Sequence, residues 1–420
     1  MKAINLQQVI RFFNPAEPLR GQHLRDWFVE RPNTSRGRVR ILLETALEPQ
    51  KLLFVGHRGS GKSTELNKLA EELEKTFFTI GLDVLAVSGR TTPGYEDLML
   101  ALSTQVIRTC IDKGLVNRPL AGPLQDGWQN MVSWWQRIVA GLPLHSPNIE
   151  LSTSVEFSTW LGQVSVGASQ SSQTREALND QINQQMPELL EHLNWVIEQA
   201  EAALNPKRLL LIVEGLDKVD LESARSIFRD HAPTITTPKA SMIYTFPLAL
   251  RHSDDYDTVR RSFDDDRYLH NIATHHADGA DDVDGVAALR RLALLRMEER
   301  LMAEDALALI VHTSGGIPVQ LIKLVRNAAV YALDRDEKTA TILLVDVQNA
   351  VKDLRRELNA PLRSADWTVL RNCRQLRRLT GDDELQRLLY NGSLIEYSND
   401  HQRCDVNPIL WGLLEENETA

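Results

Sequence analysis

One short motif constrains this chain more than any other feature of its sequence. Positions 51–64 read Lys-Leu-Leu-Phe-Val-Gly-His-Arg-Gly-Ser-Gly-Lys-Ser-Thr, and a helical pattern follows over Glu65 to Glu74. An apolar strand that runs into Gly-x-x-x-x-Gly-Lys-Ser and then a helix is typical of a phosphate-binding loop. Glycines let backbone amides converge on an anion, and the helix adds its unsatisfied N-terminal N–H groups.

Each position of this loop has an expected role. The Lys62 ammonium is expected to reach the β- and γ-phosphates, and the Ser63 hydroxyl is expected to coordinate Mg²⁺. The loop therefore predicts a bound nucleotide phosphate chain together with Mg²⁺. The residues predicted to bind the nucleotide are Gly56, His57, Arg58, Gly59, Ser60, Gly61, Lys62, Ser63 and Thr64.

A second strand provides carboxylates that a bound metal ion and a water molecule require. The apolar run Leu209–Val213 is typical of a parallel strand buried on both faces, and Glu214 and Asp217 follow it, at the end where open α/β sheets bind ligands. We expect Glu214 to share Mg²⁺ with Ser63 and Asp217 to orient or activate water. Thr245, near the end of a further strand, is the candidate sensor of the γ-phosphate, although threonine is also favoured in strands for its shape alone.

The strand and helix patterns predict an α/β protein with a five-stranded, three-layer parallel sheet of the P-loop NTPase type. Four regions are expected along the 420 residues. They are a helical lead-in at 1–50, a P-loop ATPase core at 51–275 with a Trp-rich insertion at about 115–172, a helical lid at 276–358, and a C-terminal winged helix at 359–420. Alternating apolar residues over 154–169 favour a hairpin within the insertion, whose tryptophans are expected to fill a small core.

Charge is distributed unevenly along the chain. The net charge of −10 argues against a surface built throughout to hold a phosphate polymer. Over positions 351–380, however, Lys and Arg outnumber Asp and Glu by eight to three. This basic stretch would allow the winged helix to contact the backbone of duplex DNA, although winged helices also bind only proteins. The arginines considered for DNA contact are Arg371, Arg374, Arg377 and Arg378.

The remaining composition argues against a membrane span and against a cysteine metal site. No apolar run approaches the roughly 20 residues of a membrane span, so we expect a cytoplasmic protein without membrane contact. The three cysteines, Cys110, Cys373 and Cys404, lack the spacing of a metal site and are expected to be unpaired thiols. His275 and His276 are expected on the surface.

Several motifs together resemble those of the STAND and AAA+ ATPases, most closely the NACHT-like switches and the origin-recognition-type ATPases. They are the phosphate loop, Ile212-Val-Glu-Gly-Leu-Asp217, the Tyr-Thr-Phe-Pro strand end at 244–247, the Ser-Gly-Gly-Ile-Pro break at 314–318 and the winged-helix pattern. The resemblance covers most of the chain. It implies ATP binding with Mg²⁺, a helical lid, self-association governed by nucleotide, a protein partner, and often a role in bacterial conflict or antiviral defence.

The chain departs from this family pattern at several positions. Glu214 stands where Asp is usual, and Gly215 stands where AAA+ enzymes place a catalytic Glu, so slow hydrolysis is expected. Phe246 and Val319 occupy places where arginines are usual. An arginine near the γ-phosphate stabilises the charge of the transition state. The candidate substitutes are Arg251, Arg291 and Arg296.

The sequence thus predicts an ATP-dependent molecular switch with slow hydrolysis that acts through self-association or a partner protein. Two alternatives remain open. One is a DNA-binding ATPase of the loader or transposition-accessory type, which would use its winged helix. The other is a nucleotide-binding adaptor that does not hydrolyse ATP.

Overall fold

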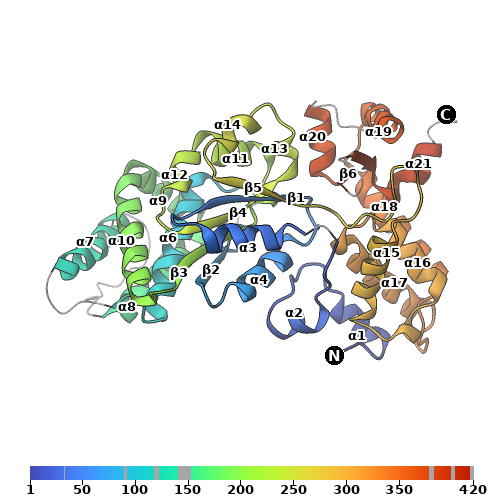
Figure 1. The fold of residues 1–420 in the computed structure, drawn as a ribbon, viewed down its shortest axis with the longest axis horizontal. Helices are drawn as coiled ribbons and strands as arrows, with labels where there is room; N and C mark the ends of the chain where they lie inside the picture. The colour runs from blue at the N-terminus through green and yellow to red at the C-terminus, as the bar shows by residue number, and fades with distance from the viewer. Residues whose placement is uncertain are drawn as a thin grey trace.

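Five parallel strands form the central sheet of the chain (Figure 1). The computed structural model describes residues 1–32, 34–88, 92–117, 123–140, 153–377, 383–398 and 403–416. The strands lie in the order β2-β3-β4-β1-β5, which places β4 between the two strands whose ends carry the predicted site. Their bounds are β1 (Lys51–Gly56), β2 (Phe77–Asp83), β3 (Arg208–Glu214), β4 (Ser241–Pro247) and β5 (Asp265–Leu269).

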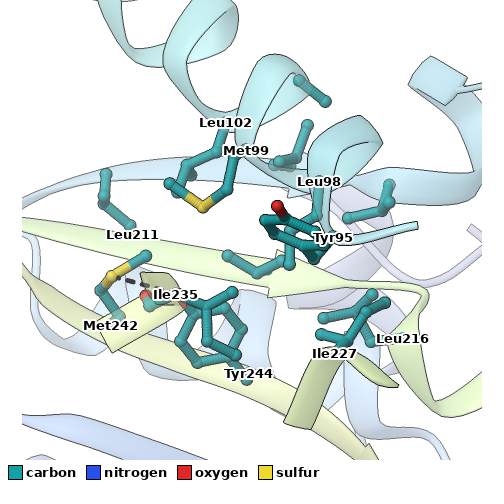
Figure 2. Close-up of a cluster of buried hydrophobic side chains, with 14 of the residues drawn as sticks. Tyr95, Leu98, Met99, Leu102, Leu211, Leu216, Ile227, Ile235, Met242 and Tyr244 are labelled. Atoms are coloured by element: carbon teal, nitrogen blue, oxygen red, sulfur yellow. Dashed lines mark hydrogen bonds between the residues drawn. The ribbon is translucent and has the colours of Figure 1, made fainter. Parts of the chain in front are cut away.

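Helices cover both faces of this sheet, which confirms the predicted three-layer α/β fold. Phe54 of β1 packs on one face in a cluster with α3 (Arg36–Thr45) and α4 (Lys62–Glu72). Val55 points to the opposite face, where α6 (Tyr95–Asp112) and α10 (Met186–Leu204) lie. Figure 2 shows this second face, with Met99 of α6 above the strands. Because successive side chains alternate between faces, a continuous apolar run suits a strand covered on both sides.

The insertion is helical in its described parts, so the predicted hairpin at 154–169 is wrong. Thr153 accepts a hydrogen bond from the Glu156 backbone N–H and begins α8. The buried side chains of this helix recur at helical rather than strand spacing, at Phe157, Trp160, Leu161 and Val164. The tryptophans of the insertion fill a core as expected, and Trp134 and Trp135 are almost completely buried. The described helices here are α7 (Pro123–Ala140), α8 (Ser154–Gln170), α9 (Ser172–Gln184) and α10.

Short helices follow β2, β3 and β4 on the face that α6 covers. They are α5 (Val84–Ser88), α11 (Leu221–Arg225), α12 (Ala232–Thr236), α13 (Leu248–Arg251) and α14 (Tyr256–Arg260). A π-helical turn at Ser226–Asp230 separates α11 from α12. No helix in the described ranges combines the length and the apolar character that a membrane crossing requires.

A helical region and a small two-stranded domain lie at the carboxyl end of the sheet (Figure 1). The first contains α15 (Val283–Leu294), α16 (Glu304–Thr313), α17 (Pro318–Arg335) and α18 (Leu344–Asn359), and it packs against α1 (Leu6–Phe12). The second contains α19 (Ser364–Leu376), α20 (Asp383–Tyr390), β6 (Leu394–Tyr397), β7 (Arg403–Val406) and α21 (Trp411–Glu416). Its order of helix, helix, strand, strand and helix confirms the predicted winged-helix arrangement.

Two smaller expectations for the C-terminal half are wrong. Cys373 of α19 and Cys404 of β7 form a disulfide, whereas Cys110 is a buried free thiol as expected. His275 is buried rather than on the surface, and its Nε2 lies 3.1 Å from a carboxylate oxygen of Asp405. The disulfide depends on the packing of α19 against β7 within the winged helix, and the burial of His275 depends on the contact of β7 with the preceding segment. The spacing of residues along the sequence reveals neither contact.

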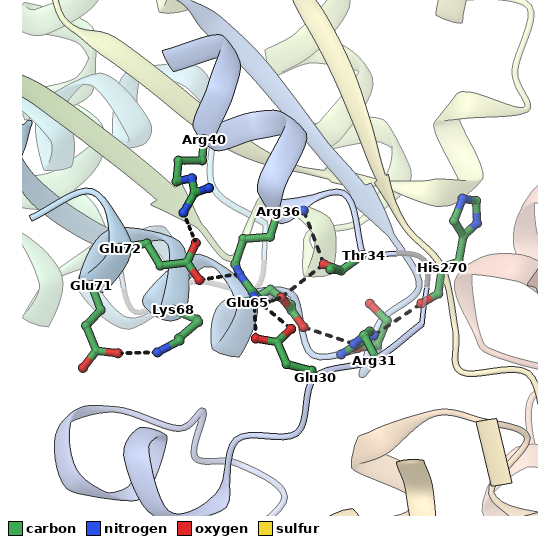
Figure 3. Close-up of polar contacts among 11 residues, drawn as sticks. Glu30, Arg31, Thr34, Arg36, Arg40, Glu65, Lys68, Glu71, Glu72 and His270 are labelled. Carbon is green, nitrogen blue, oxygen red and sulfur yellow. Dashed lines mark hydrogen bonds and ion pairs between the residues drawn. The ribbon is translucent and has the colours of Figure 1, made fainter. Parts of the chain in front are cut away.

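The N-terminal lead-in is bound to the core through a buried carboxylate on α4 (Figure 3). Glu65 is 1% exposed. It forms ion pairs with Arg31 at 3.1 Å and with Arg36 at 2.6 Å. Arg31 follows α2 (Gly21–Trp27), and Arg36 is the first residue of α3. Because buried charges are stable only when they are paired and hydrogen-bonded, these contacts fix the lead-in beside the phosphate loop.

Glu65→Gln is expected to lower the free energy of unfolding by about 3–5 kcal/mol, because it leaves two buried arginines without their shared carboxylate. The matched control is Glu71→Gln, which removes a partly exposed carboxylate of the same helix that pairs with Lys68 and Arg25. This control is expected to change the free energy by less than about 1 kcal/mol. Urea denaturation measures both changes, and equal losses in the two variants would contradict the role of the buried cluster.

Candidate functional site

The predicted phosphate loop connects β1 to α4 and turns sharply at two glycines. Gly59 and Gly61 have φ angles of 83° and 94°, in the left-handed region that other residues rarely adopt. A Cβ atom on Gly61 would lie 2.7 Å from the Arg31 guanidinium. The loop therefore requires glycine at position 61 both for its backbone conformation and for the close approach of Arg31.

Three separate parts of the chain hold this loop by its backbone and by the His57 ring. One contact comes from the segment after α2, one from the start of α17, and one from β6 of the winged helix. The contacts are Arg31 Nη2 to Ser60 O at 2.8 Å, Val319 N to Gly59 O at 3.2 Å, and Glu396 N to His57 Nε2 at 2.8 Å. A change in the loop conformation would consequently alter contacts with the lead-in, the lid and the winged helix at the same time.

Lys62 begins α4 and directs its ammonium toward the tip of β3. Its Nζ lies 2.8 Å from an Asp217 carboxylate oxygen and donates to the carbonyls of Gly56 and His57 at 2.7 and 2.8 Å. These contacts use all three N–H donors of the ammonium. Burial lowers the pKa of Lys62, and the Asp217 charge partly opposes that change. Burial alone would raise the pKa of Asp217, but Lys62 lowers it overall.

Glu214 and Ser63, the pair predicted to share a metal ion, lie close enough for the Ser63 hydroxyl to influence the pKa of the Glu214 carboxyl. Their role as metal ligands stays a prediction. Burial raises the pKa of Glu214, while Ser63 and the charge of Arg20 oppose the rise. Asp83, which pairs with Glu214 in the sheet register, raises that pKa further. A cation bound here would therefore stabilise a carboxylate that its surroundings disfavour.

The donor set fits Mg²⁺ that arrives with a nucleotide better than a resident metal ion. In the described part of the chain, no three or more His, Cys, Asp and Glu side chains gather closely enough to hold a metal ion. Mg²⁺ commonly keeps several waters and binds one or two carboxylates together with substrate phosphates. Ser63 and Glu214 would provide the protein ligands in such an arrangement.

Thr245 lies on β4, between the strands that carry the loop and the carboxylates. It is 1% exposed, and it lies close enough to the Asp217 side chain to help lower the pKa of that carboxyl. The Thr245 hydroxyl lies 3.4 Å from the Val213 carbonyl oxygen. The structure thus places Thr245 next to Asp217. A phosphate that contacted Thr245 would therefore also lie close to the Asp217 carboxylate. Its role as a sensor stays a prediction.

A cavity of about 800 Å³ lies directly beside the loop. Lys62, Ser63 and Asp217 line one part of it, and the N-terminal segment and the lid line another part. Tyr390 of the winged helix borders the cavity and donates a hydrogen bond to the Lys218 carbonyl at 3.1 Å. Arg58 also lines the cavity and is exposed to solvent.

The structure changes the interpretation of the basic stretch in the winged helix. Arg374 and Arg377 both form ion pairs with Asp405, whose side chain is fully buried. Arg374 also stacks on the Trp411 ring at 3.7 Å. These two arginines hold α19 against β7 and are engaged within the domain, because a buried carboxylate needs cationic partners. Arg378 lies outside the described residues.

Several residues of the site carry no motif that the sequence alone could reveal. Arg31 lies about thirty residues before the loop, and its guanidinium contacts a main-chain carbonyl of the loop. Glu396 lies more than three hundred residues after the loop, and its main-chain N–H contacts the His57 ring. Gly56, Lys62, Ser63, Glu214 and Asp217 were found from their motifs, and they meet at the carboxyl edge of the sheet. The parallel sheet, the loop, the lid and the winged helix define a P-loop NTPase fold.

Comparisons with known proteins yield distant structural likenesses. No protein-family model and no curated protein matches the sequence. The chain is similar to a Walker-type ATPase of Pyrococcus abyssi (13% identity, TM-score 0.48, covering 96% of this chain and 99% of that chain). It is also similar to Cdc6p of Pyrobaculum aerophilum (14%, 0.40, 97% and 98%) and to ORC1 of Aeropyrum pernix, solved in complex with DNA (10%, 0.40, 97% and 96%). At identities and TM-scores this low, the likenesses carry no argument about activity.

The buried histidines predict a loss of stability in mild acid. Burial lowers the pKa of His57 to about 3 and the pKa values of His270 and His275 to about 4. The unfolded chain takes up protons near pH 6.5, whereas the folded protein does not. Stability is therefore present above about pH 6.5 and is lost as the pH falls toward 4. Thermal unfolding between pH 7.5 and 4.5 measures this dependence.

His57→Gln is expected to reduce the pH dependence of the unfolding temperature over that range. The matched control, His23→Gln, replaces an exposed histidine and is expected to leave the dependence unchanged. If both variants kept the pH dependence of the unsubstituted protein, His57 would not contribute to it.

Proposed function

We propose that the chain is an ATP-dependent molecular switch that hydrolyses ATP slowly. The observation that carries this proposal is the meeting of Lys62, Asp217, Glu214 and Ser63 at one edge of the sheet, beside a cavity large enough for a nucleotide. A lysine at a helix N-terminus together with a glycine-rich loop binds phosphates. The adjacent carboxylates supply positions for Mg²⁺ and for a water molecule.

Binding of ATP would change the contacts of Lys62. Its ammonium has three donors, and all of them bond to Gly56, His57 and Asp217. To reach the β- and γ-phosphates, Lys62 must exchange at least one of these partners for a phosphate oxygen. Asp217 would then be free to accept a hydrogen bond from water while Thr245 keeps its carboxylate in place. Mg²⁺, held by Ser63 and Glu214, would supply positive charge to the phosphates.

The geometry of position 215 supports slow turnover. Gly215 has a φ angle of 92°, and a Cβ atom there would lie 2.8 Å from a carboxylate oxygen of Asp83. The backbone at this position therefore cannot accept a glutamate side chain without moving. Asp217 is then the carboxylate available near Lys62 to activate a water molecule. Because the ion pair with Lys62 already neutralises its charge, Asp217 would be a weak base, which is consistent with slow turnover.

The proposed switch depends on direct contacts of the loop with two other parts of the chain, the lid and the winged helix, which would change position when the nucleotide changes. Val319 of α17 and Glu396 of β6 both bond to the loop. A nucleotide shifts a conformational equilibrium only by its different affinity for the two states. Phosphates that reposition the loop would favour one placement of the winged helix, and ATP and ADP differ in the phosphate nearest to Lys62.

The alternatives have less support from particular residues. Arg374 and Arg377, proposed for DNA contact, are engaged with Asp405, so a DNA-binding ATPase would need other basic residues. A non-hydrolysing adaptor differs from the switch in one measurable property, because only the switch releases phosphate from ATP. Self-association, a protein partner and a role in bacterial conflict or antiviral defence stay predictions.

Lys62→Ala is expected to weaken ATP binding at least tenfold, because it removes a charged donor from the phosphates. Glu214→Gln is expected to retain ATP binding to within a few-fold and to lower turnover about 100-fold, because it removes a metal ligand. Calorimetry with ATP and Mg²⁺ and an assay of phosphate release measure these effects. Glu71→Gln on the surface of α4 is the control. Turnover that survives in Glu214→Gln would contradict the assigned metal site, and absence of turnover in the unsubstituted protein would favour the adaptor.

A nucleotide-dependent change of assembly is the second expected outcome. Light scattering after size-exclusion chromatography is expected to show a different mass with a non-hydrolysable ATP analogue than with ADP. Lys62→Ala is expected to give the same mass with both ligands. Equal masses for the unsubstituted protein under both conditions would rule out a switch that acts through self-association.

A further inference from the structure

The three arginines considered as substitutes for the missing family arginines lie in different surroundings. Arg251 packs over the rings of Tyr256 and Tyr268. Arg291 is exposed and lines a separate shallow pocket with Lys2. Arg296 alone among the three lines the cavity beside the phosphate loop. The cavity therefore selects Arg296 for closer attention.

Arg296 is a buried cation that has no carboxylate partner in the described part of the chain. It is 5% exposed, and burial lowers its pKa to about 10. Its guanidinium lies 5.7 Å from the Phe13 ring centroid and 5.5 Å from that of Trp27. Its Nε is buried without a hydrogen-bond partner, and no acidic side chain in the described ranges pairs with it.

This situation differs from that of the other buried arginines near the loop. Arg31 and Arg36 share the Glu65 carboxylate. An unpaired buried charge is unfavourable by several kcal/mol, and stacking on aromatic rings returns only about 0.5–2 kcal/mol. A cation kept in this state beside a cavity points to a ligand that completes its hydrogen bonds.

The direction of a nucleotide in the cavity follows from the site already described. The γ-phosphate end must lie near Lys62 and Asp217 at the tip of β3. The opposite end must then leave toward the N-terminal segment, where Leu19 N donates to Thr64 Oγ1 at 3.2 Å. Arg296 lies beside this segment, because its guanidinium is over the Phe13 and Trp27 rings. The cavity lining also includes apolar side chains of the lid, namely Leu292, Ile322, Leu354 and Leu358.

We propose that Arg296 binds the nucleoside end of the nucleotide and does not act on its γ-phosphate. The guanidinium offers five N–H donors and no acceptor, so it would recognise acceptor atoms of the base or of the ribose. The surrounding apolar side chains would cover the base. This assignment rests on the proposed function, because it takes the orientation of the nucleotide from the Lys62 site.

The test compares three ligands on the full chain by calorimetry: ATP, ADP and inorganic tripolyphosphate, each with Mg²⁺. Arg296→Met keeps an unbranched apolar stem and removes the guanidinium donors. It is expected to weaken ATP and ADP by the same factor, about tenfold or more, and to leave tripolyphosphate unchanged. Lys62→Ala is expected to weaken all three ligands. Arg291→Met, which alters the separate pocket, is the control and is expected to change none.

Thermal unfolding without ligand provides a second readout. Because Arg296 is an unpaired buried cation, Arg296→Met is expected to unfold at the same temperature or at a higher one. A lower unfolding temperature with unchanged affinity for ATP and ADP would show a structural role and overturn the proposal. A much larger loss for ATP than for ADP would place Arg296 at the γ-phosphate and also overturn it.

Should Arg296→Met not fold, Arg296→Lys, which keeps the charge but loses the planar donors, is measured with the same ligands under the same criteria. If the unsubstituted protein binds tripolyphosphate but not ATP, the nucleoside assignment fails while the phosphate loop stands. If it binds none of the three, the proposed function itself fails.

Discussion

The ion pair between Lys62 and Asp217 is the contact on which the rest of the site depends. Both groups are buried, and a buried cation persists only with a partner close at hand. Their meeting requires that β1 and β3 end at the same edge of the sheet, with β4 between them. Thr245 of that middle strand lies beside Asp217 and helps to lower the pKa of its carboxyl. The order of the strands thus assembles the candidate site from three segments that are distant in the sequence.

The phosphate loop is also the point where the outer parts of the molecule meet. The lead-in reaches it through Arg31, the lid through Val319 and the winged helix through Glu396. Each of these contacts engages a main-chain atom or a ring of the loop. A ligand that binds the loop would therefore act on all three contacts at once, and this arrangement gives a physical basis for the proposed switch.

Much of the core could be predicted from the sequence, and most of the errors lie where distant segments meet. The loop at 56–63 and the strand before Glu214 were recognisable because their chemistry depends on local spacing. The hairpin expected at 154–169 was an error of period, since the Thr153 cap and the helical repeat were present in the sequence. The buried state of His275 and the disulfide between Cys373 and Cys404 depend on packing of the winged helix, which no local pattern encodes.

By itself, the sequence determined the phosphate loop, the apolar strands and the positions of the carboxylates, because glycine spacing and strand periodicity act over a few residues. Only the tertiary structure decided which charges are paired. It joined Arg374 and Arg377 to Asp405 within the winged helix, and it left Arg296 in the cavity without a carboxylate partner among the residues that the structure describes. The reason is that the energy of a charge depends on its burial and on its nearest partner, and both are fixed by segments that lie far apart along the chain.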